Sequence, residues 1–366
     1  MKKIGQYELL NDNPMSTSSA VFYKASKDGK TYFLKKFNDP TFPSERIKIN
    51  AFAEYSRRAG LCNKFENHRK TINSMIAALG GGNFVAPTDF FLFENSYYQA
   101  TPWRKIENRT IDDIVRSSDE EKLLILKTAS NCLRLLHEKG IIHCDIKPEN
   151  MPVTLTSSNK STCSLIDFDS AILESDVPTP EEIFGTDRYW SPELMSYKMR
   201  RGYYPNNSVT VKNDVFATAI VFHYYWSGEN ITYSKPQKGP YLHHAVLEDL
   251  PITLSNKIPE WLNAILLKMI DKKPENRPSM AEVLEYLKQI TLKPTEKEEP
   301  LNTREEKIVE QKQEQINGFV KGARFPEDAV SFEVLPNGKV KFEYDDGSKM
   351  ALNIDVALRK QYITEK

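Results

Sequence analysis

The residues that could do chemistry are concentrated in one short stretch, His143 to Asn150, which reads HCDIKPEN. Within it Asp145 offers a carboxylate that can accept a proton, Lys147 a cation that can neutralise an anion, and Asn150 an amide oxygen that can bind a metal ion. Phosphoryl transfer to a hydroxyl uses these three groups, because it depends on positioning and charge more than on covalent help from the protein. The alternative is a polar turn between a helix and a strand that carries these charges by chance.

This stretch resembles the catalytic loop of the protein kinases, whose pattern is His-Arg-Asp, four residues and then Asn. The resemblance implies that Asp145 accepts the proton of the attacking hydroxyl, that Lys147 neutralises the transferred phosphoryl group and that Asn150 holds Mg²⁺. A lysine at this position is the form found in serine/threonine kinases. Cys144 replaces the arginine that grips an activation-loop phosphate in many kinases, so we expect no activation through that contact.

A second acidic stretch, SLIDFDSA, spans residues 164–171 and follows the catalytic loop. It resembles the kinase segment Asp-Phe-Gly, with Asp167 as its first residue. The resemblance implies that Asp167 and Asn150 hold the metal ion together with phosphate and water. The alternative for Asp167 is an ordinary aspartate at the end of a strand. Asp169 stands where the family has glycine, and we expect its charge either to strengthen cation binding or to repel the nucleotide.

The segment TYFLKKF, residues 31–37, resembles the kinase strand whose lysine binds the α- and β-phosphates of the nucleotide. Because side chains alternate along a strand, only one of Lys35 and Lys36 can face a cleft, and the alignment selects Lys35. The alternative is a pair of solvated lysines on an edge strand. The family pairs its strand lysine with a glutamate of the next helix, and Glu66 is the candidate here, with Glu54 as the second choice.

The loop that covers the nucleotide phosphates departs from the family. Its pattern, Gly-x-Gly-x-x-Gly-x-Val, places three glycines at Met15, Thr17 and Ala20 and the valine at Phe22. Small polar residues can still bring amides and hydroxyls to phosphate, although each Cβ restricts the approach that glycine permits. The resemblance therefore implies nucleotide contacts from Thr17, Ala20 and Phe22. Phe33 replaces an alanine above the adenine, so its ring would narrow the pocket or force the base to sit lower.

The edge of the adenine would meet the chain where the two lobes join. For this hinge the resemblance selects Thr101, Pro102 and Trp103. Because proline has no N–H, one of the usual backbone donors to the base is absent. We expect the base to lie against Thr101 and Trp103.

Regular elements are expected on both sides of these residues. Apolar alternation predicts strands at 7–10, 20–25 and 31–37, with a hairpin turn at Asp28-Gly29, and two more strands around a turn at 94–96. Helical spacing predicts helices over 45–79 and 120–139, and the second should end at Gly140 and deliver the catalytic loop. Further helices are expected at 214–226, at 259–270 and after a capping box at 279–282.

Three charged residues favour the protein kinases over other phosphotransferases. Glu193 and Arg277 match positions at which the family has a buried ion pair. Asp214 matches the aspartate that anchors the catalytic loop from beneath. Kinases of small molecules with a similar catalytic loop generally lack the Glu–Arg signature, so the resemblance favours phosphorylation of proteins.

Composition limits the partners and the compartment. The 366 residues include 50 basic and 50 acidic side chains, and 40% are apolar, as in soluble globular proteins. Zero formal charge gives no support to nucleic acid or a membrane as partner. We find no run long enough to span a bilayer and no signal peptide. The four cysteines lie far apart, without a CxxC pair, which favours free thiols and a cytoplasmic protein.

We predict an α+β protein with a two-lobe kinase fold over residues 1–290, followed by a small β-rich appendage. A β-rich lobe is expected over about 1–103 and a larger helical lobe over about 104–290. Residues 291–317 are charged and poor in apolar side chains, as in a linker or solvated helix. Alternation over 318–366 predicts a three-stranded meander closed by a short helix, a marginal domain that would dock on the kinase lobe or on a partner protein.

The predicted function is ATP-dependent transfer of the γ-phosphate to a serine or threonine hydroxyl of a protein, with Mg²⁺ or Mn²⁺ as the metal. Two other functions stay open. The altered phosphate loop and Asp169 suit a pseudokinase, which would bind partners as a scaffold without turnover. The third option is a kinase that acts on a small molecule.

Overall fold

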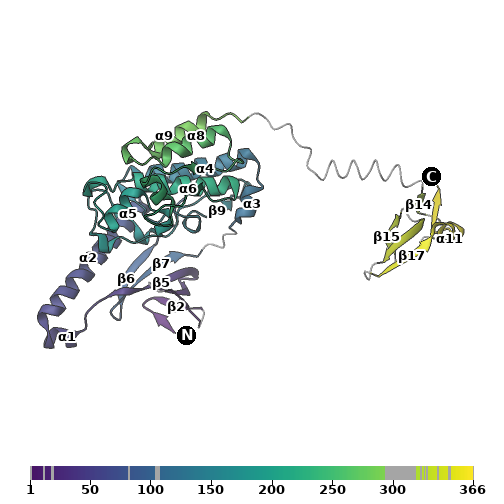
Figure 1. The fold of residues 1–366 in the computed structure, drawn as a ribbon. Helices are drawn as coiled ribbons and strands as arrows, with labels where there is room; N and C mark the ends of the chain where they lie inside the picture. Colours follow the sequence, from purple (N-terminus) through teal and green to yellow (C-terminus); the bar gives the residue numbers. More distant parts are fainter. Residues whose placement is uncertain are drawn as a thin grey trace. The chain divides into compact units, whose positions relative to one another are not determined.

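The computed structural model describes residues 2–10, 13–17, 20–80, 83–103 and 108–292, and then 319–321, 324, 326, 329–335, 338–344 and 348–365. The chain divides into two compact units, Met1–Thr291 and Leu292–Lys366, which are coloured purple to green and yellow in Figure 1. Within the described ranges, no helix is both long and apolar enough to cross a membrane.

The first unit begins with a seven-stranded antiparallel sheet in the order β1-β2-β4-β5-β7-β6, with β3 paired to β4. Its strands are β1 (Lys3–Ile4), β2 (Tyr7–Leu9), β3 (Met15–Ser16), β4 (Ala20–Lys27), β5 (Lys30–Thr41), β6 (Asp89–Phe93) and β7 (Ser96–Pro102). The predicted hairpin is confirmed, because Lys27 pairs with Lys30 and both turn residues, Asp28 and Gly29, have positive φ. This register also sets Phe22 opposite Lys35 on one face of the sheet.

Two helices follow β5, where one was predicted over 45–79. They are α1 (Glu45–Asn50) and α2 (Phe52–Ala77), and they are separated at Ala51, whose φ of −152° and ψ of 67° lie outside the helical region. The buried side chains of α2 are Cys62, near the middle of the helix, and Arg69, Ile72 and Ile76 in its C-terminal half. Figure 1 shows the other end of α2, with α1, extending away from the sheet.

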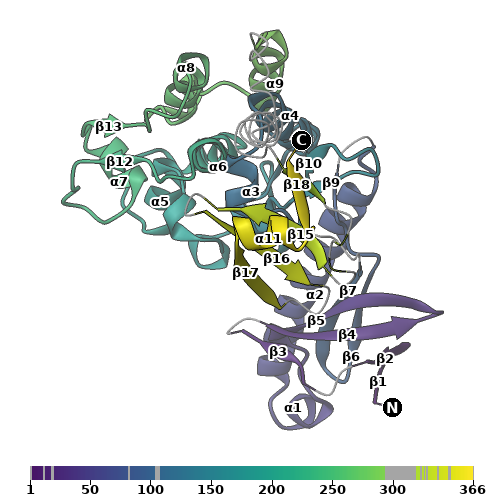
Figure 2. The same ribbon diagram turned by 90° about the vertical axis from the view of Figure 1, so that its right-hand side faces the viewer.

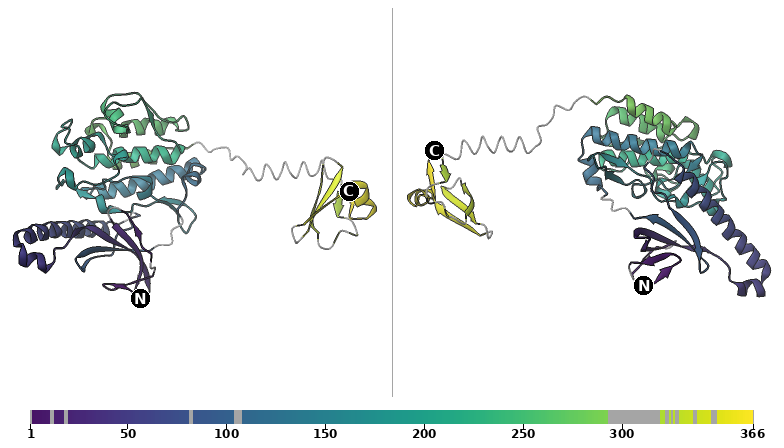
Figure 3. Two further views of the ribbon diagram at one scale, coloured as in Figure 1. Left: turned by 60° about the horizontal axis from the view of Figure 1, so that its bottom comes forward. Right: turned by 180° about the vertical axis from the view of Figure 1, so that it is seen from behind.

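The rest of the first unit is mainly helical, and in Figure 3 it forms a layer separate from the purple sheet. Its helices are α3 (Ile111–Val115), α4 (Asp119–His137), α5 (Pro192–Lys198), α6 (Lys212–Ser227), α7 (Leu242–Leu247), α8 (Glu260–Met269) and α9 (Met280–Gln289). Short hairpins pair β8 (Ile141–Ile142) with β11 (Ile172–Leu173), β9 (Val153–Leu155) with β10 (Ser161–Cys163) and β12 (Thr232–Tyr233) with β13 (Ile252–Thr253). Single 3₁₀ turns are η1 (Pro148–Asn150), η2 (Phe168–Ser170), η3 (Pro180–Glu182), η4 (Asp187–Tyr189), η5 (Asn206–Ser208) and η6 (Pro274–Asn276).

The predicted helix boundaries agree closely with these elements. Helix α4 is followed by Gly140 at φ +65°, as the glycine signal indicated. Ser279 and Glu282 form the predicted capping box of α9, each side chain bonding the other residue's backbone N–H. Helix α6 is buried almost all round, which explains why its sequence is apolar without helical periodicity.

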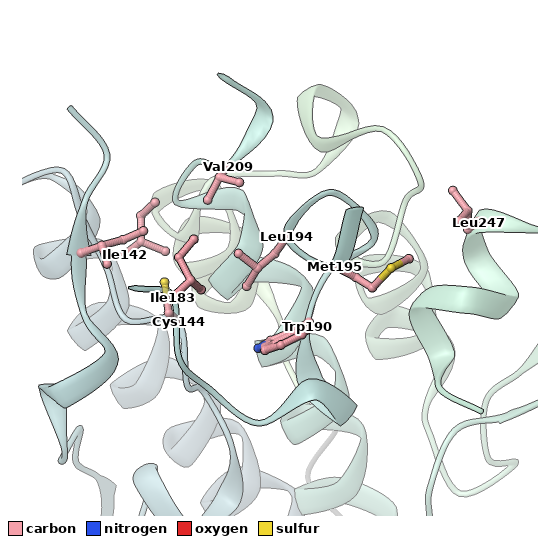
Figure 4. Packing of buried hydrophobic residues seen from close by; sticks show 9 residues of the cluster. Ile142, Cys144, Ile183, Trp190, Leu194, Met195, Val209 and Leu247 are labelled. Atoms are coloured by element: carbon pink, nitrogen blue, oxygen red, sulfur yellow. The ribbon is translucent and has the colours of Figure 1, made fainter. Parts of the chain in front are cut away.

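One buried cluster of apolar side chains joins the catalytic loop to α5, to the segment before α5 and to residues after it (Figure 4). Its members are Ile142, Cys144, Ile172, Ile183, Trp190, Leu194, Met195, Val209 and Leu247. Cys144 is therefore a small buried filler, and burial raises the pKa of its thiol. This environment leaves the thiol uncharged and gives it no role as a nucleophile.

The second unit contains the predicted three-stranded meander. Figure 2 shows β15 (Ala329–Val334), β16 (Lys339–Tyr344) and β17 (Lys349–Asn353) side by side, and α11 (Ile354–Arg359) contacts β16 and β17. A pair that was not predicted, β14 (Phe319–Lys321) with β18 (Ile363–Glu365), adds a second small sheet. The core consists of Ala329, Val340, Phe342, Ala357 and Ile363. The predicted charged linker from residue 293 onward and residues 345–347, between β16 and β17, lie outside the described residues.

Candidate active site

The catalytic loop rests on one buried carboxylate at the start of α6. Asp214 accepts hydrogen bonds from the backbone N–H groups of His143, at 2.7 Å, and of Cys144, at 3.0 Å. The ring nitrogen Nε2 of His137 lies 3.1 Å from the same carboxylate. Cys144 has φ +64°, so these bonds hold the loop in a backbone conformation that a residue with a Cβ rarely adopts. The predicted anchoring of the loop by Asp214 is confirmed.

Asp145 is held by donors on both of its carboxylate oxygens. Its Oδ2 accepts from Lys147 Nζ at 2.7 Å and from Asn150 Nδ2 at 2.9 Å. Its Oδ1 accepts from the backbone N–H of Thr186 at 2.8 Å and from the Thr186 hydroxyl at 2.7 Å. Burial alone would raise the pKa of Asp145, but the hydrogen bonds from Lys147 and Thr186 outweigh it and lower the pKa. Asp145 is thus an oriented, ionised carboxylate of the kind that can accept a proton.

Thr186 is a site residue that the sequence patterns did not reveal. Besides its two bonds to Asp145, its hydroxyl accepts from Lys147 Nζ at 2.9 Å, so it ties both residues together. Gly185 before it has φ +149°, and a Cβ there would lie 2.5 Å from the carbonyl oxygen of Cys144. That close approach requires glycine and brings Thr186 to the loop. The available signal was the position of Thr186 directly after this glycine, in GTDRYWSPEL.

A backbone hydrogen bond joins Asn150 to the residue that precedes Asp167. The backbone N–H of Ile166 donates to the Asn150 carbonyl oxygen at 3.1 Å, which places the next residue, Asp167, beside the loop. The Asn150 amide NH₂ donates to the Asp145 carbonyl oxygen at 2.8 Å and to its carboxylate, so the amide oxygen points away from Asp145. Although 46% of the Asp167 side chain is exposed, its pKa is raised, first by desolvation and then by the negative charge of Asp169.

An amide oxygen beside a carboxylate with a raised pKa is a donor pair that fits a divalent cation such as Mg²⁺ or Mn²⁺. A cation would favour the ionised form of Asp167. Among the described residues there is no group of three or more His, Cys, Asp or Glu that could hold a metal ion by itself. Asn150 and Asp167 would therefore share the ion with phosphate and water.

Asp169 does not turn toward this pair. Its Oδ2 accepts from Lys35 Nζ, and its Oδ1 accepts from Arg69 Nη1 at 3.3 Å and from Gln99 Nε2 at 3.4 Å. Burial opposes ionisation, but the two cations outweigh it and lower the pKa of Asp169. Lys35 and Arg69 thus compensate much of the charge of Asp169, and its predicted effect on a cation or nucleotide stays a prediction.

Of the two adjacent lysines it is Lys35 that reaches Asp167 and Asp169, but its expected glutamate partner is different. Of the two candidate glutamates, both in the described part of the chain, neither contacts Lys35. Glu66 accepts from Lys70 at 2.5 Å and from the Tyr97 hydroxyl at 3.2 Å, while Glu54 pairs with Arg57 at 2.9 Å on the surface. From α2 it is the cation Arg69 that reaches this region. Because two cations cannot pair with each other, Lys35 and Arg69 both bind the carboxylate of Asp169.

The loop between β3 and β4 is closed on itself at the residues that the structure describes. The Thr17 N–H donates to the Ala20 carbonyl oxygen at 2.8 Å, and the Ala20 N–H donates to the Thr17 hydroxyl at 3.1 Å. These donors, assigned to nucleotide phosphates by the family pattern, are used within the turn. Ala20 is completely buried, and Ser18 and Ser19 lie outside the described residues.

At the predicted hinge, residues 101–103, a backbone N–H group that adenine would need as a donor is already hydrogen-bonded within the sheet. Thr101 and Pro102 pair with Phe33 and Tyr32 on β5, and the Trp103 N–H donates to the Thr31 carbonyl oxygen at 2.9 Å. Since Pro102 has no N–H, neither Pro102 nor Trp103 presents a free backbone donor here.

Three aromatic side chains, Phe22, Phe33 and Trp103, lie along the sheet at this end of the cleft, and we call them the aromatic roof. The rings of Phe22 and Phe33 are stacked at 5.2 Å, and those of Phe33 and Trp103 are 6.2 Å apart. Lys35 Nζ lies 5.3 Å from the Phe22 ring, so the roof is on the same face of the sheet as the lysine. A base that entered here would meet rings where the family has small aliphatic side chains.

Comparisons with known proteins agree with this geometry. A family model described as "Protein kinase domain" matches residues 21–287. The putative serine/threonine-protein kinase R436 of Acanthamoeba polyphaga mimivirus is 27% identical over 165 residues, which are 44% of this chain and 54% of that protein. Serine/threonine-protein kinase PknB of Mycobacterium leprae is 31% identical over 183 residues, 47% of this chain and 27% of PknB. A Wee1-like protein kinase of Arabidopsis thaliana is 27% identical over 173 residues, 47% of this chain and 30% of that protein. The chain thus matches about half of the viral relative and less than a third of the other two.

Proposed function

The chain belongs to the protein kinase domain family, and we propose that it transfers the γ-phosphate of ATP to a serine or threonine hydroxyl of a protein substrate. The observation that carries this proposal is the arrangement of donors around Asp145. Lys147, Asn150 and Thr186 together hold both oxygens of an ionised carboxylate in a fixed orientation. Such a group is what the attacking hydroxyl needs as a proton acceptor.

In this mechanism Asp145 takes the proton of the substrate hydroxyl as the hydroxyl oxygen attacks the γ-phosphorus. The bond between the γ-phosphorus and the β–γ bridging oxygen breaks, and ADP leaves. Lys147, 2.7 Å from Asp145, neutralises negative charge on the phosphoryl group. Thr186 holds the side chains of Lys147 and Asp145 in place through hydrogen bonds to both. The Asn150 amide oxygen and the Asp167 carboxylate would hold Mg²⁺ or Mn²⁺, which when bound supplies positive charge to the phosphate oxygens. Lys35, 3.8 Å from Asp167, is placed to orient the α- and β-phosphates.

Support for a protein substrate comes from the segment that leads into α5. Thr186, which touches Asp145, and Glu193 lie in the same segment, and Glu193 is tied to Arg277 in the core. The segment next to Asp145 is therefore anchored at Thr186 to the catalytic loop and at Glu193 to the core, which offers a fixed surface to a protein substrate. The named serine/threonine kinases among the relatives support the same class.

The alternative is a catalytically impaired scaffold, and specific observations favour it. Hydrogen bonds inside the protein use the N–H groups of Thr17, Ala20 and Trp103, and the aromatic roof occupies the expected position of the base. A protein with these features would bind nucleotide weakly or only after the turn and the hinge rearrange. The intact donor set around Asp145 makes turnover our first choice.

Phosphate transfer by the purified full chain distinguishes the two functions. The protein is incubated with γ-labelled ATP, Mg²⁺ or Mn²⁺ and a generic basic protein, and the label is followed on both proteins. We expect labelled phosphoserine or phosphothreonine in the wild type and none in Asp145→Asn. Absence of label in the wild type with either metal, or equal label in the variant, would contradict the proposed activity.

A further inference from the structure

The ion-pair partners of Lys35 on β5 are Asp167 and Asp169, and neither lies on helix α2. We propose that Asp169 is the positioning residue for Lys35 and that Arg69 of α2 holds Asp169, so that α2 controls the lysine through a carboxylate on another segment. The inference rests on the proposed function, because it assigns a role in placing the nucleotide. It is carried by the contacts among these three side chains.

The three side chains form one partly closed ion cluster. Their exposed fractions are 14% for Lys35, 18% for Asp169 and 6% for Arg69. Asp169 uses one oxygen for Lys35 and the other for Arg69, so it bridges two cations that would otherwise repel each other. Gln99 donates to the second oxygen and is itself held by Asn73 of α2 at 3.2 Å. The three donors Lys35, Arg69 and Gln99 together fix the orientation of the Asp169 carboxylate.

Asp169 and Asp167 have different tasks in this arrangement, although only one residue separates them. Asp169 binds Lys35 directly, whereas Asp167 lies 3.8 Å from the lysine and keeps an exposed side chain. The pKa of Asp169 is lowered by Arg69 and Lys35 against the effect of burial, while that of Asp167 is raised. One carboxylate is therefore compensated within the protein, and the other is left available to a cation.

Helix α2 and the segment around Asp169 are joined by further bonds. Arg69 Nη1 also donates to the Phe168 carbonyl oxygen at 3.0 Å, and His68 Nε2 lies 2.9 Å from the Ala171 carbonyl oxygen. Any shift of α2 along the cleft would move residues 168–171 and, through Asp169, the ammonium of Lys35. The position of α2 is thereby linked to the place where the phosphates bind.

In a direct pair the helix supplies a carboxylate to the strand lysine. Here α2 supplies the cation Arg69, and the carboxylate comes from Asp169. Two substitutions can restore the direct pair. Asp169→Gly leaves Arg69 facing Lys35 without a bridge, and Arg69→Glu sets a second carboxylate against Asp169. The double variant, Arg69→Glu with Asp169→Gly, offers Lys35 a carboxylate from α2 and removes the bridging one. Each single variant should raise the KM for ATP by about tenfold or more with a smaller change in kcat.

The double variant should recover most of this loss, to within about threefold of the wild-type KM. Recovery by combining two damaging changes is a result that a role in packing alone would not produce. A double variant as impaired as the worse single variant would overturn the proposal. So would an Asp169→Gly variant with the wild-type KM.

A second measurement does not depend on phosphate transfer, so it separates this inference from the proposed function. Lys35 of the nucleotide-free full chain is modified with an amine-reactive ester, and labelled peptides are quantified by mass spectrometry with Lys36 as internal reference. Asp169→Asn keeps the shape of the side chain but releases the ammonium, so Lys35 should react several times faster. Glu66→Gln, which changes a carboxylate that does not touch Lys35, should leave the rate unchanged. An unchanged rate in Asp169→Asn, or a faster one in Glu66→Gln, would overturn the assignment even if the wild type transfers no phosphate.

Discussion

Arg277 and Glu193, 84 positions apart in the chain, form a bidentate ion pair that is completely buried. Nη1 lies 2.7 Å from Oε1 and Nη2 lies 2.9 Å from Oε2, and both side chains are 0% exposed. Arg277 Nε also donates to the Asp271 carbonyl oxygen at 2.7 Å, and Nη1 donates to the Lys212 carbonyl oxygen at 3.1 Å. Because each nitrogen of the guanidinium has a partner, these bonds offset the desolvation of both charges.

Removing the cation of this pair should destabilise the fold strongly. Arg277→Ala leaves the Glu193 carboxylate buried without its partner, which should cost on the order of 3 kcal/mol of unfolding free energy. Denaturant titration of the full chain measures the difference. The matched control is Arg57→Ala, which breaks an exposed pair with Glu54 on α2 and should give no measurable change. Equal stability of wild type and Arg277→Ala would show that the pair contributes nothing.

The sequence was sufficient to predict an interaction when both of its partners belong to a recognisable motif. Glu193 with Arg277, and Asp214 with the catalytic loop, were predicted in this way and are confirmed. The partner of Lys35 was missed for a physical reason. Helix α2 carries charges of both signs on several faces, so its periodicity could not show that Arg69 points into the cleft. Thr186 was missed because its contacts depend on the tight approach at Gly185, and a glycine followed by a threonine does not by itself predict such an approach.

Two aspartates should be indispensable for transfer for different reasons. Asp145→Asn removes the proton acceptor, and Asp167→Asn removes the carboxylate ligand of the metal, so each should reduce phosphate transfer to background. Circular dichroism and denaturant titration should show folded proteins, since the amide keeps the volume of the carboxyl group. Glu149→Gln is the matched control, because this exposed residue lies in the same loop and should retain transfer. Wild-type rates in either aspartate variant would refute the role given to that residue.

Acid should weaken transfer through Asp167 before it affects Asp145. The pKa of Asp167 is raised and that of Asp145 is lowered, so on acidification Asp167 takes up a proton at a higher pH than Asp145. Cations bind the ionised carboxylate, and affinity for Mg²⁺ should therefore fall as the pH drops through the raised pKa. Excess Mg²⁺ competes with the proton and should move the acid limb of kcat/KM to lower pH. An acid limb that stays in place between low and saturating Mg²⁺ would contradict this assignment.

The aromatic roof should limit nucleotide affinity. Phe33 stacks on Phe22 at the place where adenine would lie, so Phe33→Ala should open space for the base and lower the KM for ATP. Fluorescence binding of an ATP analogue gives an independent affinity. Leu92→Ala, on an exposed position of β6, is the control and should change neither value. Weaker binding by Phe33→Ala would instead mean that the ring stacks on the base and helps to hold it.

Metal and nucleotide should bind with strong mutual dependence, and Asp167 should be the origin of that dependence. Without a cation, the phosphates of ATP approach the negative charge of Asp167, whose pKa is raised by desolvation and by the neighbouring charge of Asp169. A divalent ion between Asp167, Asn150 and the phosphates turns this repulsion into attraction, with a coupling of about 2 kcal/mol or more. ATP should therefore raise the melting temperature little in a chelator and clearly with Mg²⁺ or Mn²⁺.

Two variants of neighbouring aspartates locate this coupling. Asp167→Asn removes both the repulsion and the metal ligand, so the shifts with and without metal should become similar. Asp169→Asn should behave differently, because Lys35 and Arg69 already compensate its charge. It should weaken ATP under both conditions by releasing Lys35 and leave the difference between them nearly intact. If Asp169→Asn removes the metal dependence and Asp167→Asn preserves it, the two carboxylates have the opposite roles. A wild-type shift that is the same with and without metal would contradict the metal site itself.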